Sequence, residues 1–320
     1  MTHSARATNG NETMSDILIL VGFSYLNKLQ ILLFLFLLVI YLATLMGNLL
    51  VILLITLSPS LHTPMYFFLV NLSFLEICFT TSMVPQLLVH LLVEEKTISI
   101  AGCAAQVYFI DIMGVTECCL LAAMAYDRYV AICHPLHYTT IMSSRVSAYL
   151  TGASWLIGIS VVVAVTTWIF SLPFCGSNLI QHFSCDLPPV MRMVCTDTSQ
   201  IQISVFILSV LFIMNPFLLI LLSYICIIST IFKMPSTEGR HKVFSTCSSH
   251  LTVVILFYGT ALITYLIPKS GSTTESDLLI SLLNKIVSPV LNPIIYTLRN
   301  KEVNGALRNI LKKSSFSHRW

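Results

Sequence analysis

Seven long runs of apolar residues alternate with short polar segments along the 320-residue chain. Each run reaches or exceeds the roughly 20 residues that a helix needs to cross the hydrocarbon core of a bilayer. We place the runs at 29–57, 64–89, 100–133, 146–172, 201–232, 243–267 and 278–298. The pattern predicts an all-α membrane protein, a bundle of seven transmembrane helices. Runs longer than about 25 residues are expected to tilt or to extend beyond the membrane.

Composition supports a membrane protein with one embedded domain. Hydrophobic residues make up 56% of the chain and charged residues only 10%, whereas soluble domains carry about 25% charged residues. Mean hydropathy is +0.86. We therefore expect an N-terminal segment at 1–28, a membrane domain at 29–299 and a tail at 300–320. Residues Met1–Asp16 are polar and lack an apolar core, so no cleavable signal peptide is expected.

Lysine and arginine in the connecting segments set the expected orientation. Most of them lie on the side of the bundle that carries Arg128, Arg240 and Arg299, and basic loops are retained in the cytoplasm. The N-terminus is then extracellular, in a protein of the plasma membrane, and the sequon at Asn11 lies on the side where N-glycosylation occurs. The tail repeats apolar residues at helical spacing among basic ones, which predicts a short amphipathic helix on anionic membrane lipids.

Four ionisable residues fall inside the predicted spans: Glu76, Asp111, Glu117 and Lys285. Such residues are functional candidates because charge is costly in hydrocarbon. Helical rise places Glu117 about 16 Å from Arg128, and it places Glu76 about 21 Å above the same side of the membrane. The two carboxylates are therefore expected at similar depth, where they would share a cation or one proton. In the alternative, each carboxyl is hydrogen-bonded separately to Ser, Thr or Asn.

Asp111 and Lys285 are both expected in the outer part of the bundle. Asp111 lies about 25 Å above Arg128, and Lys285 lies about 21 Å above Arg299. The two side chains are expected to pair with each other or with a polar group of a ligand. A structural ion pair, or two solvated groups, is the alternative.

Several motifs identify a family. The third run ends Met-Ala-Tyr-Asp-Arg-Tyr-Val-Ala-Ile-Cys at Met124–Cys133, and the second begins Pro64-Met65-Tyr66. The sixth begins Lys-Val-Phe-Ser-Thr-Cys-Ser-Ser-His-Leu from Lys242, with Val243 as its one mild departure, and the seventh ends Pro-Val-Leu-Asn-Pro-Ile-Ile-Tyr at Tyr296. This set resembles the odorant (olfactory) receptors of the class II type, which belong to the rhodopsin-like (class A) G-protein-coupled receptors.

The resemblance implies a mechanism. An odorant, a small volatile molecule, binds in the outer half of the bundle, and the sixth helix shifts. Arg128, held at rest by Asp127, is then released to a heterotrimeric G protein of the Gs/olfactory type, which raises cAMP. The residues implied in coupling are Asp127, Arg128, Tyr129, Tyr224, His250 and Tyr296. Those implied in a polar network, with a sodium ion or a proton at Glu76 and Glu117, are Asn48, Glu76, Glu117 and Asn292. No other cofactor or metal is expected.

The same resemblance suggests the ligand site and the disulfides. The expected lining is Ile110, Asp111, Gly114, Val115, Leu208, Phe212, Tyr258, Ala261, Leu262, Tyr265 and Lys285, with Asp186 as a further candidate. Four cysteines on the outer side allow three pairings. The resemblance selects Cys103–Cys185 and Cys175–Cys195, which would fix the loop between the fourth and fifth runs over the mouth of the bundle.

Two other classes of protein were considered. A transporter could use the charges inside the membrane, but the inverted repeats typical of such proteins are not visible in the sequence. An enzyme is not expected because the chain has no Walker loop, His-Glu-x-x-His or Gly-x-Ser-x-Gly motif. Nucleic acid is not an expected partner.

Overall fold

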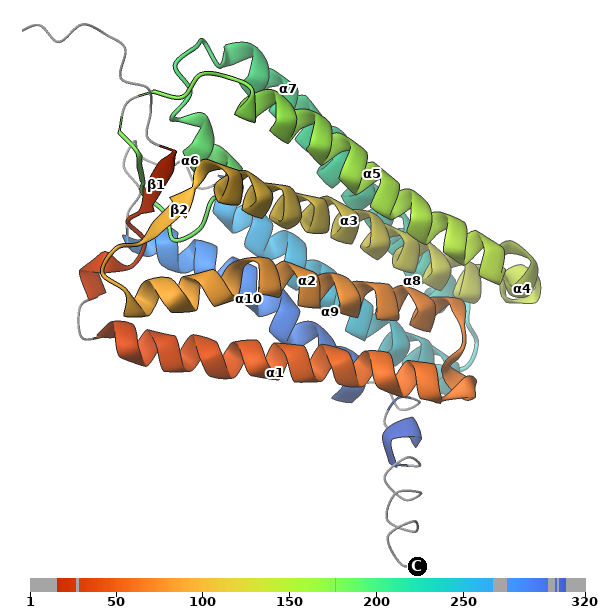
Figure 1. Cartoon of the computed structure of the whole chain (residues 1–320). Coiled ribbons are helices and arrows are strands. Elements are labelled where there is room, and N and C mark those ends of the chain that lie inside the picture. The colour runs from red at the N-terminus through yellow and green to blue at the C-terminus, as the bar shows by residue number, and fades with distance from the viewer. Residues whose placement is uncertain are drawn as a thin grey trace, which may run out of the picture.

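The computed structural model describes residues 16–26, 29–175, 177–266, 275–298, 303 and 305–308, without the side chains of 242, 245, 246, 262–266, 297 and 298. Within these residues, seven long helical segments lie side by side in one bundle (Figure 1). They are α1 (Leu29–Leu57), α2 (Pro64–Leu92), α3 (Ile100–Cys133), α5 (Ser144–Phe170), the continuous segment of α7 (Ser199–Ser209), η4 (Val210–Met214) and α8 (Asn215–Lys233), then α9 (Thr237–Leu266) and α10 (Glu275–Leu298).

Short elements connect these helices. They are the strands β1 (Ile17–Leu20), β2 (Thr97–Ser99) and β3 (Leu179–Ile180), the single turns η1 (Ser24–Leu26), η2 (Pro59–Leu61) and η3 (Pro135–His137), and the short helices α4 (Tyr138–Ile141) and α6 (Leu187–Met191). Proline begins η2, α2 and η3, where its missing N–H would have no helical partner.

The predicted spans agree closely with the observed helices. α1 and α3 have the predicted bounds, and six of the segments are long and apolar enough to cross a membrane. In α9 the apolar stretch is shorter, Cys247–Ala261. The helix begins at Thr237 rather than at 243. Its first turns are polar and extend beyond the apolar stretch, so the apolar pattern does not reveal them.

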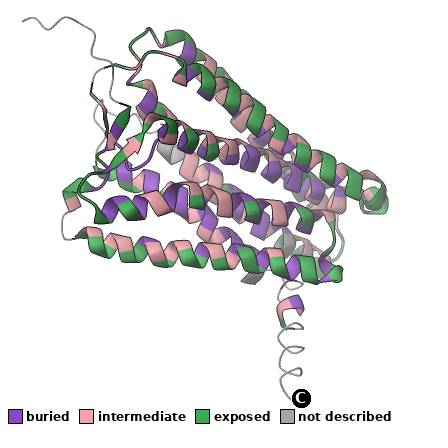
Figure 2. Ribbon diagram, in the orientation of Figure 1, coloured by how far each residue is buried: buried purple, intermediate pink, exposed green. Residues whose placement is uncertain are grey.

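The apolar surface is distributed as a lipid-facing bundle requires. In Figure 2, α3 is largely buried, whereas α1 and α5 carry exposed positions along their outer sides. In the most apolar 18-residue stretch of each helix, 11% of the residues are buried in α1 and 56% in α3. Large apolar side chains such as Leu32 and Phe36 are more than half exposed. In a membrane protein such exposed apolar surfaces face the lipid tails.

A π-helical turn interrupts the fifth span. The backbone N–H of Asn215 donates to the carbonyl of Val210, five residues earlier, and Pro216 follows at once. Proline has no N–H to donate, so the helix is irregular where that bond is missing. Phe212, one of the predicted lining residues, lies within this turn.

The N-terminal segment forms part of a small sheet that the polar character of the first residues did not predict. β1 lies between β2, its antiparallel partner, and β3, its parallel partner. Gly22 follows with φ of +46°, and its Cα would place a Cβ 3.3 Å from the backbone of Phe183. Glycine allows both the left-handed conformation and the close approach. Phe23, 1% exposed, then stacks on Phe183 with ring centroids 5.4 Å apart.

Small residues let the helices pack closely. A Cβ on Gly47 would lie 3.1 Å from Pro293 Cγ of α10, and the neighbouring Asn48 donates through Nδ2 to the carbonyl of Pro289, 3.2 Å away. Gly158 of α5 is tighter still: its Cβ would lie 2.2 Å from Thr116 Oγ1 and 3.0 Å from the carbonyl oxygen of Ile112. Close backbone approach through glycine is a general means of helix association in membranes.

We predict that Gly158→Ala destabilises the receptor by about 1–3 kcal/mol, because the added methyl forces α3 and α5 apart. The measurement is the thermal unfolding midpoint of purified protein, together with the amount at the cell surface. Gly152→Ala on the same helix is the matched control, since a Cβ there meets no atom within 4 Å. Equal midpoints for the two variants would contradict the prediction.

Candidate ligand, cation and coupling sites

The outer end of the bundle is covered by the loop that follows α5. Two disulfides are present, Cys103–Cys185 with an S–S distance of 2.07 Å and Cys175–Cys195 with one of 2.11 Å. They have the connectivity that the family resemblance implied. The first joins the loop to the start of α3, and the second closes the loop on itself.

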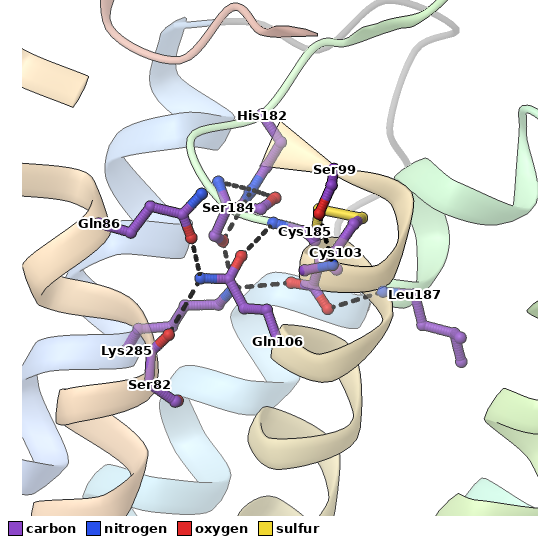
Figure 3. The surroundings of a disulfide bond; sticks show 12 residues. Ser82, Gln86, Ser99, Cys103, Gln106, His182, Ser184, Cys185, Leu187 and Lys285 are labelled. Carbon is purple, nitrogen blue, oxygen red and sulfur yellow. Dashed lines mark hydrogen bonds and ion pairs between the residues drawn. A yellow bond between two sulfur atoms is a disulfide. The ribbon is translucent and has the colours of Figure 1, made fainter. Parts of the chain in front are cut away.

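Polar side chains hold the same loop against α2 and α3 (Figure 3). Gln106, one turn after Cys103, accepts a hydrogen bond from the backbone N–H of Cys185 at 2.8 Å. Its Nε2 donates to Gln86 Oε1 at 2.9 Å and to the carbonyl oxygen of Ser82 at 3.1 Å. The amide of Gln106 is therefore fully used in fixing the loop. Gln106 belongs to no recognised motif, and its only signal in the sequence is its position three residues after Cys103.

Lys285 joins the loop to α10. Its Nζ lies 2.9 Å from Asp186 Oδ2 and 3.0 Å from Ser184 Oγ. The side chain of Asp186 also caps α6 by accepting a hydrogen bond from the N–H of Leu187 at 3.0 Å. The prediction that Asp111 and Lys285 form a pair is therefore wrong. Asp186 takes the ammonium because the disulfide at Cys185 delivers the adjacent residue directly to α10.

His182 and Phe183 complete the contact of the loop. The ring nitrogens of His182 lie 3.1 Å from Ser281 Oγ of α10 and 3.0 Å from the carbonyl oxygen of Ser184. The ring of Phe183 lies 5.4 Å from Lys285 Nζ and packs on Phe23. The N-terminal segment, the loop and α10 thus form one connected cover, of which only Asp186 and Lys285 were sequence candidates.

The charges of this cover keep Asp186 ionised. Burial by itself raises the pKa of Asp186, but Lys285, His182 and the two donated hydrogen bonds outweigh burial and hold its pKa below the ordinary value of 3.8. A carboxyl whose pKa is lower in the folded state stabilises the fold at every pH above its ordinary pKa. That contribution is lost only as the pH falls through the lower folded value.

The predicted lining residues lie on α3, α7, η4, α9 and α10. Ile110 and Tyr258 are buried, whereas Asp111, Gly114, Val115, Leu208, Phe212 and Ala261 are partly exposed. The Tyr258 ring packs on Phe217 at 4.7 Å. The side chains of Leu262 and Tyr265 lie outside the described residues, as does Asn11.

A buried cluster of acids and amides occupies the middle of the bundle. Asn292 of α10 donates through Nδ2 to Glu76 Oε1 of α2, and the charges of Glu76 and Glu117 are close enough to interact. Both carboxyl groups are at most 5% exposed. Among the described residues, Glu76 Oε2, Glu117 Oε1, Asn48 Oδ1 and Asn292 Oδ1 have no hydrogen-bond partner.

These unpartnered oxygens fit a hard cation. Carboxylate and amide oxygens are the donors that such ions prefer, and buried acceptors without a donor carry a large desolvation cost. The donor types therefore suit a sodium ion. A single proton on one carboxyl group would instead supply one hydrogen-bond donor to these oxygens.

At the inner end, the acid and base of the Asp-Arg-Tyr motif are not joined. Asp127 Oδ1 accepts a hydrogen bond from the hydroxyl of Tyr138 at 2.8 Å. Within the described part of the chain, Arg128 forms no ion pair, and its Nε has no hydrogen-bond partner. The expectation that Asp127 holds Arg128 is therefore not met in this conformation, because α4 brings the Tyr138 hydroxyl to the carboxylate first.

The remaining coupling residues lie around Arg128. The hydroxyl of Tyr224 on α8 lies 2.8 Å from His250 Nδ1 on α9, and His250 Nε2 lies 3.2 Å from the carbonyl oxygen of Leu121 on α3. The Arg128 charge is within electrostatic range of Tyr224, His250 and Tyr296. Tyr129 instead points its hydroxyl to His134, 3.1 Å away. Polar side chains of α8, α9 and α10 therefore lie within electrostatic range of Arg128 on α3.

The fold places the chain in a known class. It is similar to the crystal structure of squid rhodopsin, with a TM-score of 0.69, 18% sequence identity and coverage of 86% of this chain and 78% of rhodopsin. The likeness shows a rhodopsin-like helical membrane fold.

The sequence comparisons narrow the class to a family. A family model described as olfactory receptor matches residues 37–314. Human olfactory receptor 10A4 is 55% identical over 305 residues, covering 95% of this chain and 97% of that receptor. Human olfactory receptor 10A5 is 54% identical, covering 95% and 96%. The chain belongs to the olfactory receptor family, of the class II type.

It follows that the chain is a multi-pass receptor of the plasma membrane that senses odorants and acts through a G protein, and not an enzyme.

We predict that Asp186→Asn lowers the free energy of unfolding by about 1–3 kcal/mol at neutral pH, because it leaves the Lys285 ammonium without a counter-charge. The unfolding midpoint of purified receptor measures the effect. The difference from the natural protein should be constant through mildly acidic and neutral pH and should shrink only as the pH falls below 3.8. Glu95→Gln, at an exposed acid of the loop before β2, is the control. A difference that disappears near neutral pH would refute the assignment.

Proposed function

We propose that an odorant binds in the outer half of the bundle and that binding activates a G protein of the Gs/olfactory type, which raises cAMP. The observation that supports coupling is the environment of Arg128, which forms no ion pair with any described residue and lies among residues of α3, α8, α9 and α10. A cation held this way is available to a partner that docks at the inner face. A ligand shifts the receptor only if it binds the active conformation more tightly.

Three segments divide the work in this proposal. The N-terminal segment, 1–28, contributes its strand to the outer cover. The bundle, 29–299, holds the ligand and the coupling residues. Of the tail, 300–320, the described residues Val303 and Ala306 are buried in the same cluster as Tyr296, which suits the amphipathic helix expected on the inner leaflet.

The outer site consists of side chains from α3, the fifth span, α9 and α10. Apolar groups dominate it, as suits volatile ligands whose burial gives roughly 25 cal/mol per Å². Asp111 and Lys285 supply its charges. The loop held by Cys185, Gln106 and Lys285 excludes water from above, which strengthens each polar contact that a ligand makes below it.

The middle cluster is proposed to couple the two ends. A cation between Glu76 and Glu117 would draw together α2, α3 and, through Asn292, α10. Its release would relax those contacts when the helices shift. The unpartnered oxygens described above support this role.

The test of the coupling proposal uses cells that lack Gs-type α subunits. An odorant that raises cAMP in ordinary cells should fail in these cells and succeed when the α subunit is restored. We predict that Arg128→Gln weakens this response by more than about tenfold at equal surface expression, since a charged contact to the partner is lost. Arg145→Gln, at an exposed residue of α5 on the same side, is the control. A response that survives without Gs-type subunits would overturn the proposal.

We predict for the middle cluster that sodium chloride raises the unfolding midpoint of the ligand-free receptor by about 2–6 °C over choline chloride at equal ionic strength. Glu76→Gln should abolish the sodium effect, and Glu94→Gln, an exposed acid of the outer loop, should not. The same sodium effect in Glu76→Gln would remove the cation from this site. A midpoint that depends on pH and not on sodium would favour the shared proton.

A further inference from the structure

Two carboxyl groups, Asp111 and Asp186, and one ammonium, Lys285, lie close together at the outer end of the bundle. The ammonium of Lys285 is taken up by Asp186 and Ser184. Asp111 of α3 is near enough to interact electrostatically with both Asp186 and Lys285. It forms no hydrogen bond or ion pair with any residue that the structure describes. Two carboxyl groups thus share one ammonium, and Asp111 has no cation of its own among the described residues.

Among the residues that the structure describes, no other titratable group at the outer end supplies the missing cation. The ring nitrogens of His182 are occupied by Ser281 and Ser184. The first turn of α10 adds two further acids, Glu275 and Asp277. The mouth of the bundle is therefore acidic, which attracts cations toward it.

Asp111 borders open space. It retains accessible surface although it faces the loop and α10. Gly114 and Val115, three and four residues later, lie on the same face of α3, and both are partly exposed. A Cβ placed on Gly114 would meet no atom within 4 Å. The face of α3 below the loop therefore has room for a ligand beside the carboxylate.

A carboxylate in such a place calls for a cationic partner. Charge in a partly dehydrated site is costly unless it is paired, and an ammonium brings both charge and three N–H donors. Lys285 is unsuited to binding acids or aldehydes, because its ammonium is already held by Asp186. We propose that Asp111 is a specificity-determining residue and that the receptor prefers volatile primary amines, which bind as ammonium ions with their apolar chains beside Gly114 and Val115.

This inference rests on the proposed odorant site, and its test separates the two. Hexylamine, hexanol, hexanal and hexanoic acid share one carbon skeleton and differ in the charge and polarity of the head group. The full-length receptor is expressed in cells with the G protein that gives the largest signal, and responses are normalised to surface expression. Hexylamine is expected to be the most potent of the four on the natural receptor.

Asp111→Asn should weaken the response to hexylamine by about 10- to 100-fold, the loss expected for a hydrogen bond between charged groups. The response to hexanol should change by less than about threefold, and Asp111→Glu should restore most of the amine response. Asp186→Asn removes the carboxylate that holds Lys285, so the unpaired ammonium should weaken the hexylamine response and strengthen the hexanoic acid response.

Two results would overturn the amine assignment alone: hexanol or hexanal acting more potently than hexylamine, or Asp111→Asn weakening all responses equally at normal surface expression. Silence toward all four probes at normal surface expression would overturn the proposed odorant site together with the amine assignment.

Discussion

A charged or polar side chain inside a bilayer must find its partners within the protein, since lipid tails offer none. This constraint organises the whole molecule. The helices turn apolar residues such as Leu32 outward and bring their polar residues together inside. The polar residues gather at three heights: Lys285 with the outer loop, Glu76 with Asn292 in the middle, and Arg128 with its neighbours at the inner end. Each of these clusters joins helices that are far apart in the sequence.

The outer cluster depends on a covalent link. The disulfide at Cys185 brings the loop to the top of α3, and the residues on either side then meet different helices. Ser184 and Asp186 reach Lys285 on α10, and the N–H of Cys185 itself reaches Gln106 on α3. The N-terminal strand adds to the same cover through Phe23. The stability of the cover therefore depends on Lys285, which joins the loop to α10.

The inner and middle clusters have polar groups that are incompletely paired. Arg128 has no carboxylate partner among the described residues, and oxygens of Glu76 and Glu117 have no donor. Buried groups without partners cost free energy, and they are most often retained where a second state or a bound ion supplies what is missing. In the proposed mechanism these are the places where an ion and a G protein act.

The sequence by itself determined the family and the bundle. Helix bounds follow from apolar runs whose minimum length the bilayer sets, so the predicted 29–57 and 100–133 agree with α1 and α3. The motif at Asp127 and the intramembrane acids were visible because charge in an apolar run is rare. Only the tertiary structure decided which groups meet. Lys285 pairs with Asp186 rather than with Asp111, and Asp127 contacts Tyr138 rather than Arg128. Helical rise gives the height of a side chain, but its partner depends on loop paths, which a disulfide and a short helix set and which sequence spacing does not reveal.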